Sequence, residues 1–176
     1  MLINHKIAAV LIGAALLPMA TWLPTGLLPS ASAGSVTLKM GVSATVPANC
    51  NFNNSTPALS FGSYDPTGLQ ATSALTASAS FTIRCTKNTT ATMTIDNGVN
   101  ASNSQRRMTD GAGDYLNYQL YSDPAYTTVW DLTNTVSYTS TSAATAQTET
   151  VYGSVPAAQD VAVGNYSDTV TITAAY

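Results

Sequence analysis

Hydrophobic and polar residues alternate with a period of two along most of the chain, which is the spacing of a β-strand with two different faces. The longest run covers residues 36–46, where every second side chain from Val36 onward is apolar. Shorter runs cover residues 77–85, 91–96, 114–123, 150–155 and 170–176. Outside the N-terminal region no segment shows the 3.6-residue period of a helix. The pattern predicts an all-β protein.

Turn-forming residues separate these runs. Asp96-Asn97-Gly98 ends one predicted strand, and residues 100–114 and 156–164 are polar or rich in small residues, so we expect loops there. Residues 133–146 are rich in Thr, Ser and Ala and predict a weak strand followed by a loop. Short strands at regular spacing with turns between them predict one antiparallel β-sandwich domain.

Residues 1–33 differ from the rest of the chain. Lys6 precedes an apolar stretch over residues 7–20, and small residues occupy positions 31–33. This is the pattern of a secretory signal peptide, and we expect cleavage after Ala33. A retained transmembrane helix is the alternative, which three prolines within residues 18–29 disfavour.

The two cysteines, Cys50 and Cys85, both lie in the part expected to be exported. In an oxidising compartment an even pair of cysteines favours one disulfide bond. Two free thiols, or a metal site with two cysteine ligands, remain as alternatives.

The composition narrows the possible functions. Of 176 residues, 45% are hydrophobic and only 9% are charged, against roughly 25% charged in a typical domain. Six basic residues and a net charge of -3 disfavour binding to nucleic acid or to acidic membranes. Loss of residues 1–33 would remove His5, the only histidine, and Glu149 is the only glutamate. Without histidine, Ser-His-Asp catalysis and His-ligated zinc are excluded, so we expect no enzyme, no cofactor and no small-molecule substrate.

Three smaller features each allow two interpretations. Asp110 and Asp114 flank glycines, but their spacing does not match a calcium-binding loop, so a solvated loop is expected. Arg106 and Arg107 predict a plain surface pair, or a contact with acidic residues of a neighbouring subunit. Alternating aromatic residues favour cross-strand pairs in a sandwich core over a sugar-binding face. These aromatic residues are Tyr115, Tyr118, Tyr121, Tyr126 and Trp130.

Seven strings along the chain resemble, in order, those of the spore coat protein U domain family. They are residues 44–50 (ATVPANC), 61–66 (FGSYDP), 106–108 (RRM), 116–123 (LNYQLYSD), 129–130 (VW), 151–153 (VYG) and 164–171 (GNYSDTVT). The family includes subunits of archaic chaperone-usher pili, the Csu-type pilins. The resemblance covers nearly all of the chain after residue 33. It implies an immunoglobulin-like antiparallel β-sandwich with Cys50 bonded to Cys85, in which an incomplete pilin-type fold is completed by a donor strand.

The resemblance also implies a mechanism, in which the extended N-terminal segment of one subunit fills the groove of the next. We expect residues 34–43 to be this donor segment and residues 44–176 to form the domain, whose first strand would begin over Val46–Cys50. The donated side chains would be Val36, Leu38, Met40 and Val42. A slip by one residue would bury Lys39, so the alternation also fixes the register. The alternative is that residues 35–46 form an ordinary edge strand of their own domain.

Apolar residues also alternate up to the C-terminus. They are Val170, Ile172, Ala174 and Tyr176. The resemblance implies that this strand borders the groove and that a periplasmic chaperone holds it during export. An internal core strand without a special partner is the alternative.

The function implied by the resemblance is that of a secreted structural subunit, polymerised into a surface fibre of a Gram-negative bacterium for adhesion and biofilm formation. Its partners would be identical or related pilin subunits, a periplasmic chaperone and an outer-membrane usher. A coat or envelope matrix protein with the same fold is one alternative. A monomeric secreted adhesin or binding domain is another.

Overall fold

The computed structural model describes residues 32–53 and 57–176. The chain divides into two units, residues 1–43 and residues 44–176. The described part of the first unit contains no helix or strand, and the side chains expected to be donated are between 82% and 100% exposed. The predicted signal peptide lies outside the described residues, apart from residues 32 and 33. No helix in the described ranges is long and apolar enough to cross a membrane.

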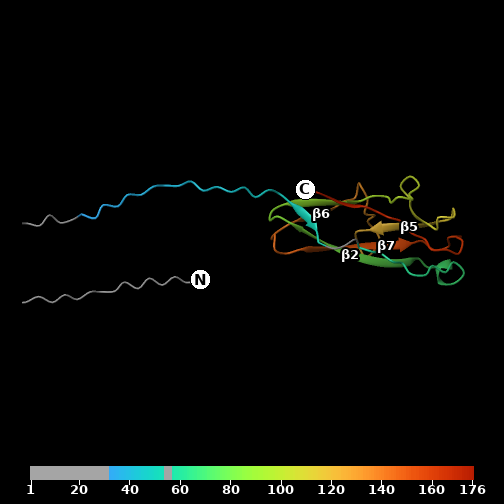
Figure 1. Cartoon of the computed structure of the whole chain (residues 1–176). Helices are drawn as coiled ribbons and strands as arrows, with labels where there is room; N and C mark the ends of the chain where they lie inside the picture. The colour runs from blue at the N-terminus through green and yellow to red at the C-terminus, as the bar shows by residue number, and fades with distance from the viewer. Residues whose placement is uncertain (1–31, 54–56) are drawn as a thin grey trace, which may run out of the picture. The chain divides into compact units, whose positions relative to one another are not determined.

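The second unit contains two antiparallel sheets (Figure 1). The larger sheet has the strand order β1 (Cys50–Phe52), β2 (Leu75–Cys85), β7 (Gln147–Val155), β5 (Tyr115–Tyr121) and β4 (Arg106–Thr109). The smaller sheet has the order β6 (Val136–Thr139), β3 (Thr90–Ile95) and β8 (Ile172–Ala175). Among the described residues the only helical element is the short 3₁₀ turn η1 (Leu69–Ala71). The prediction of an all-β, immunoglobulin-like antiparallel sandwich is confirmed.

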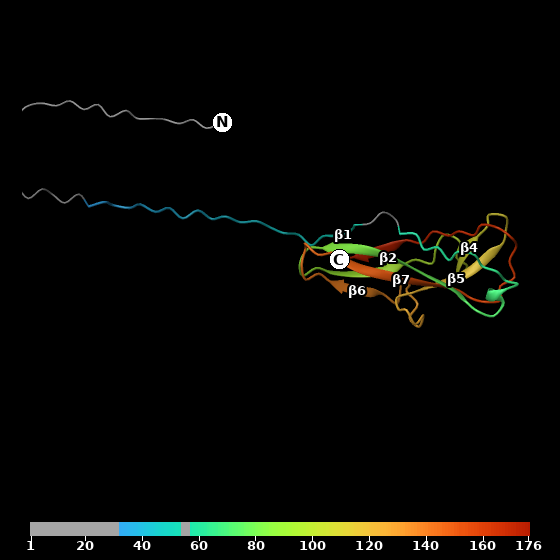
Figure 2. The same ribbon diagram turned by 90° about the horizontal axis from the view of Figure 1, so that it is seen from below.

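Alternate residues of the strands fill the space between the sheets, as the period of two predicts. From β2, β3 and β5 the buried side chains are Phe81, Ile83, Cys85, Ala91, Met93, Ile95, Leu116, Tyr118 and Leu120. Trp130 enters this core from a loop, and its indole Nε1–H donates to the carbonyl of Met93 at 3.0 Å. Figure 2 shows β1 and the C-terminus at one end of the sandwich and β4 at the other.

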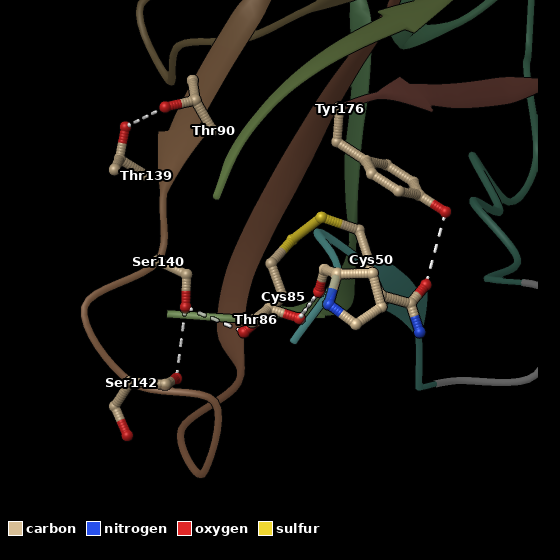
Figure 3. Close-up of a disulfide and its surroundings, with 10 residues drawn as sticks. Cys50, Cys85, Thr86, Thr90, Thr139, Ser140, Ser142 and Tyr176 are labelled. Atoms are coloured by element: carbon tan, nitrogen blue, oxygen red, sulfur yellow. Dashed lines mark hydrogen bonds between the residues drawn. A yellow bond between two sulfur atoms is a disulfide. The ribbon is translucent and has the colours of Figure 1, made fainter. Parts of the chain in front are cut away.

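The disulfide between Cys50 and Cys85 joins residues that face each other in the β1–β2 pair, which confirms the predicted bond. Figure 3 shows its surroundings. Ser140 Oγ donates to the carbonyl of Cys85 at 3.0 Å, and the Tyr176 hydroxyl donates to Asn49 Oδ1 at 3.3 Å. The start of the domain and its C-terminus are therefore tied together near this bond.

Three strand predictions were wrong in detail. Residues 36–46 form no strand with the other described residues of the single chain, neither a long one nor an edge strand. The domain's first strand begins at Cys50 rather than Val46, whose side chain is 77% exposed. Strand β4 lies within residues 100–114, which were predicted to be a loop. The apolar pattern did not indicate this strand, because its buried residue is an arginine rather than an apolar side chain.

Candidate functional site

A pair of backbone hydrogen bonds links an edge of the larger sheet to the segment that leads into the smaller one. There, Thr109 and Ser167 exchange two backbone hydrogen bonds of 3.0 and 2.9 Å, which connect β4 to the segment that leads into β8. Beyond this link, on the side away from β3, β8 has no strand partner among the described residues. The sandwich is therefore open between the segments 57–61 and 166–172.

A cavity of about 380 Å³ occupies this opening, and we call it the acceptor groove. One wall is the segment 57–61 and the other is the segment 166–172. Side chains of the larger sheet line it from below, among them Ala79, Leu120 and Val151. A second cavity of about 960 Å³ continues it towards residues 62–66 and 161–165, sharing Leu59 and Phe61 with the first. The opening is therefore elongated and mainly apolar at its base.

The wall next to β8 presents unpaired backbone groups. Thr169 and Thr171 turn theirs towards the smaller sheet, because their carbonyls accept hydrogen bonds from Val99 and Asp96, each at 3.1 Å. Successive residues of an extended chain direct their N–H and C=O groups to opposite sides. Those of Val170, Ile172 and Ala174 therefore face the groove, where no partner for them exists within the described ranges.

The same residues were predicted from the sequence to border the groove. The side chains of Val170, Ile172 and Ala174 point inward and pack against the core, whereas Tyr176 is 59% exposed and bonded to Asn49. A further strand laid along β8 would find both backbone partners and apolar side chains here. Exposed edges of this kind are sites of strand addition.

The opposite wall was not identified from the sequence. Within the described part of the chain, residues 57–63 form no strand and no hydrogen bond. Leu59 and Phe61 nevertheless pack against Gly153 of β7. A Cβ atom at Gly153 would lie 2.7 Å from Phe61 Cζ and 3.0 Å from Leu59 Cδ2, so only glycine permits this approach. The alternation of Leu59 and Phe61 was the signal in the sequence that could have found this wall.

A polar network lies beneath the wall next to β8. The Tyr118 hydroxyl donates to Asp168 Oδ2 at 2.7 Å, and Asn100 donates its side-chain and backbone N–H groups to Asp168 Oδ1 at 2.9 and 3.2 Å. Asp96 Oδ1 accepts the backbone N–H of Thr171 at 2.9 Å. Both carboxylates thus hold the backbone that leads into β8.

Arg106 is fully buried, which corrects the prediction of a surface pair with Arg107. Its guanidinium donates to the carbonyls of Ile95 (3.1 Å), Asp96 (2.7 and 2.9 Å) and Trp130 (2.8 Å), and to the side-chain oxygen of Gln119. No pattern in the sequence indicates this burial, because the oxygens come from distant segments. Arg107 donates to the carbonyl of Asn100 at 3.1 Å and lies 4.0 Å above the ring of Tyr115.

Burial and hydrogen bonding shift the pKa values in this network. Burial and the bond to Asp168 raise the pKa of the Tyr118 phenol, so the hydroxyl keeps its proton and acts as donor. Burial would raise the pKa of Asp96, but hydrogen bonds from Thr171 and Gly98 and the charge of Arg106 together lower it. Burial lowers the pKa of the Arg106 guanidinium below its ordinary value, and the nearby phenol and carboxylate groups partly offset this shift.

The remaining candidate residues do not form a second site. Asp110 caps its own loop by accepting the backbone N–H groups of Ala112, Gly113 and Asp114, which lower its pKa. No cluster of three potential metal ligands occurs in the described ranges. The five aromatic residues do not share a face, since Tyr118 and Trp130 are in the core while the others lie nearer the surface.

The fold and the groove together define an immunoglobulin-like sandwich of the pilin type. The family model of the Spore Coat Protein U domain matches residues 36–173. Protein U of Myxococcus xanthus is 30% identical over 154 residues, which are 81% of this chain and 86% of that protein. The chain belongs to the Spore Coat Protein U domain family.

A solved structure shares the fold. It is the chaperone-tip adhesion subunit pre-assembly complex of CsuC and CsuE, from the archaic chaperone-usher Csu pili of Acinetobacter baumannii. The similarity has a TM-score of 0.50 at 21% sequence identity and covers 75% of this chain. The matched region makes up 40% of the length of the solved chain.

Proposed function

We propose that this chain is the structural subunit of a surface fibre and that it polymerises by donor-strand complementation. In this proposal, residues 34–43 of one copy lie along β8 in the acceptor groove of the next copy. The observation that carries the proposal is the combination, in one chain, of an open apolar groove and an unpaired alternating segment. The segment has exposed apolar side chains that could fill the groove, and the groove has an apolar base that could bury them.

The donated segment carries one apolar face. Its side chains Val36, Leu38, Met40 and Val42 are almost fully exposed in the single chain. Burial of four such side chains contributes roughly 6 to 12 kcal/mol at about 1.5 to 3 kcal/mol each. Association costs an amount of similar size. The backbone hydrogen bonds to Val170, Ile172 and Ala174 are therefore needed as well.

The same groove suggests a chaperone as the partner before assembly. An open apolar groove with an unpaired edge promotes aggregation unless another chain covers it. The solved relative is a complex between a chaperone and a pilus subunit, which supports a periplasmic chaperone in this role. Export to the cell surface through an outer-membrane usher completes the proposed route, and the Cys50–Cys85 bond suits an oxidising compartment. In this proposal the fibre serves in adhesion and biofilm formation.

Electron microscopy of cells that produce the chain with its chaperone and usher tests the proposal. Fibres are expected for the full chain and should disappear when residues 34–43 are deleted. Purified fibres should contain this chain as a repeating component. If the deleted form still makes fibres of the same appearance, donor-strand complementation by this segment is wrong.

A coat or envelope matrix protein is the second candidate, and the match to Protein U together with the family's description favours it. Mechanical shearing separates the two. A fibre subunit is released from the cells as filaments, whereas a matrix protein stays with the cell envelope. Both candidates assemble through the same groove. They differ in whether the polymer is a fibre that extends from the cell or a layer that covers the envelope.

A further inference from the structure

The wall of the acceptor groove next to β8 has little regular secondary structure to hold it. Strand β8 begins only at Ile172, and Asp168–Thr171 have no assigned strand. A chain bonded on one side only is prone to fray. Something else must keep these residues extended while the groove is empty.

Asp168 fixes this segment to both sheets at once. Tyr118 reaches it from β5 of the larger sheet, and Asn100 reaches it from the loop that follows β3 of the smaller sheet. Asn100 Nδ2 also donates to the carbonyl of Ser167 at 3.3 Å. Gly98 leaves room for this carboxylate, because a Cβ atom there would lie 2.0 Å from Asp168 Oδ2.

Asp96 fixes the same segment three residues further along. Its carboxylate accepts the N–H of Thr171 at 2.9 Å and that of Gly98 at 3.0 Å, while its own N–H donates to the carbonyl of Thr171 at 3.1 Å. Val99 donates to the carbonyl of Thr169 at 3.1 Å. None of these bonds uses the backbone groups of Val170, Ile172 or Ala174 that face the groove.

We infer that Asp168, Asp96 and Tyr118 are positioning residues, which hold the wall of the empty groove in the extended form that a donor strand pairs with. The inference rests on the proposed function and goes beyond it. A wall ordered in advance lowers the entropy that donor binding must overcome. The network therefore acts on the capture of the donor, through the backbone rather than by touching the donor itself.

The test uses the full chain with Leu38→Asp and Met40→Asp, which prevent it from donating to its own copies. The probe is a fluorescent peptide of residues 34–43. Further substitutions are Asp168→Ala and Asp96→Ala, with Asp168→Asn as the conservative variant, because its amide can still bond to both Tyr118 and Asn100. Asp114→Ala is the matched control, since this exposed carboxylate makes no side-chain hydrogen bond within the described residues.

We expect Asp168→Ala and Asp96→Ala to slow peptide association by about tenfold or more, as the loss of two or more bonds implies. Asp168→Asn and Asp114→Ala should bind at close to the parent rate. Hydrogen exchange should become faster at the amides of Val99 and Thr171 in the free alanine variants, since these amides donate to the carbonyl of Thr169 and to the carboxylate of Asp96, while amides of β2 and β7 keep their protection. A purely structural role would instead accelerate exchange throughout the domain. Tyr118→Phe removes a single bond and gives a milder variant should the alanine variants not fold.

Folded alanine variants that bind the peptide at the parent rate, with unchanged exchange at the amides of Val99 and Thr171, would overturn the inference. Failure of the parent chain to bind the peptide would instead contradict the proposed function. In that case exchange in the free chain still decides whether the network orders the wall.

Discussion

Replacing Arg106 by alanine is expected to destabilise the domain far more than the same change at its neighbour Arg107. Arg106 is fully buried and donates to three backbone carbonyls, those of Ile95, Asp96 and Trp130, and to the side chain of Gln119. Removal leaves these oxygens without their donor inside the core.

The size of the effect follows from the bonds lost. An unsatisfied buried polar group costs about 1 to 3 kcal/mol, and breaking a buried charged interaction costs about 3 to 5 kcal/mol. We therefore expect Arg106→Ala to lower the free energy of unfolding by about 4 kcal/mol, a large part of the roughly 5 to 15 kcal/mol typical of a domain. Arg106→Lys should cost about 2 kcal/mol or more, because one ammonium group cannot reach oxygens on several sides. Arg107→Ala loses one hydrogen bond and a ring contact at the surface, for about 1 kcal/mol or less.

Urea unfolding of the full chain measures these differences, with Leu38→Asp and Met40→Asp in every variant to keep the chain monomeric. Equal slopes of free energy against urea would show that the variants unfold to the same extent. The reasoning would be refuted if Arg106→Ala and Arg107→Ala lowered the free energy of unfolding by similar amounts.

Three further predictions concern the disulfide, the packing of Gly153 against the wall of the groove formed by residues 57–61, and the carboxylate of Asp96. Replacing Cys50 and Cys85 together by alanine opens a loop closed across 35 residues and should lower the free energy of unfolding by about 4 kcal/mol, measured by urea unfolding; no loss would contradict it. Gly153→Ala should cost about 1 to 3 kcal/mol by displacing Phe61, and the double variant with Phe61→Ala should cost less than the sum of the single changes. The lowered pKa of Asp96 contributes stability above its unfolded value of 3.8, which is lost as the pH falls through the folded value; Asp96→Asn should therefore flatten the loss of thermal stability below about pH 4.

The strands with apolar alternation could be predicted from the sequence. Strands β2, β3 and β5 lie within or close to the segments in which apolar residues recur at every second position, because the core is filled by one face of each strand. The disulfide could be predicted too, from an even number of cysteines and from the expectation that the chain is exported. The resemblance then placed these elements in a pilin-type sandwich.

The groove could be predicted only in part. The wall next to β8 was visible as apolar alternation up to the C-terminus, but Leu59 and Phe61 depend on the absence of a side chain at Gly153. Strand β4 was missed because Arg106 is polar, and its burial requires carbonyl oxygens from separate segments of the chain. Contacts between distant segments of this kind leave no periodic pattern in the sequence.

The central claim is that residues 34–43 of one copy complete the sandwich of the next. It is tested most directly by electrophoresis of fibres in SDS, with and without heating. The parent chain should give a ladder of oligomers that collapses to monomers on heating. Leu38→Asp with Met40→Asp should give monomers alone, whereas Ser35→Asp with Thr37→Asp, on the opposite face of the segment, should keep the ladder. A parent chain that is monomeric without heating, or a ladder that survives Leu38→Asp with Met40→Asp, would contradict the account.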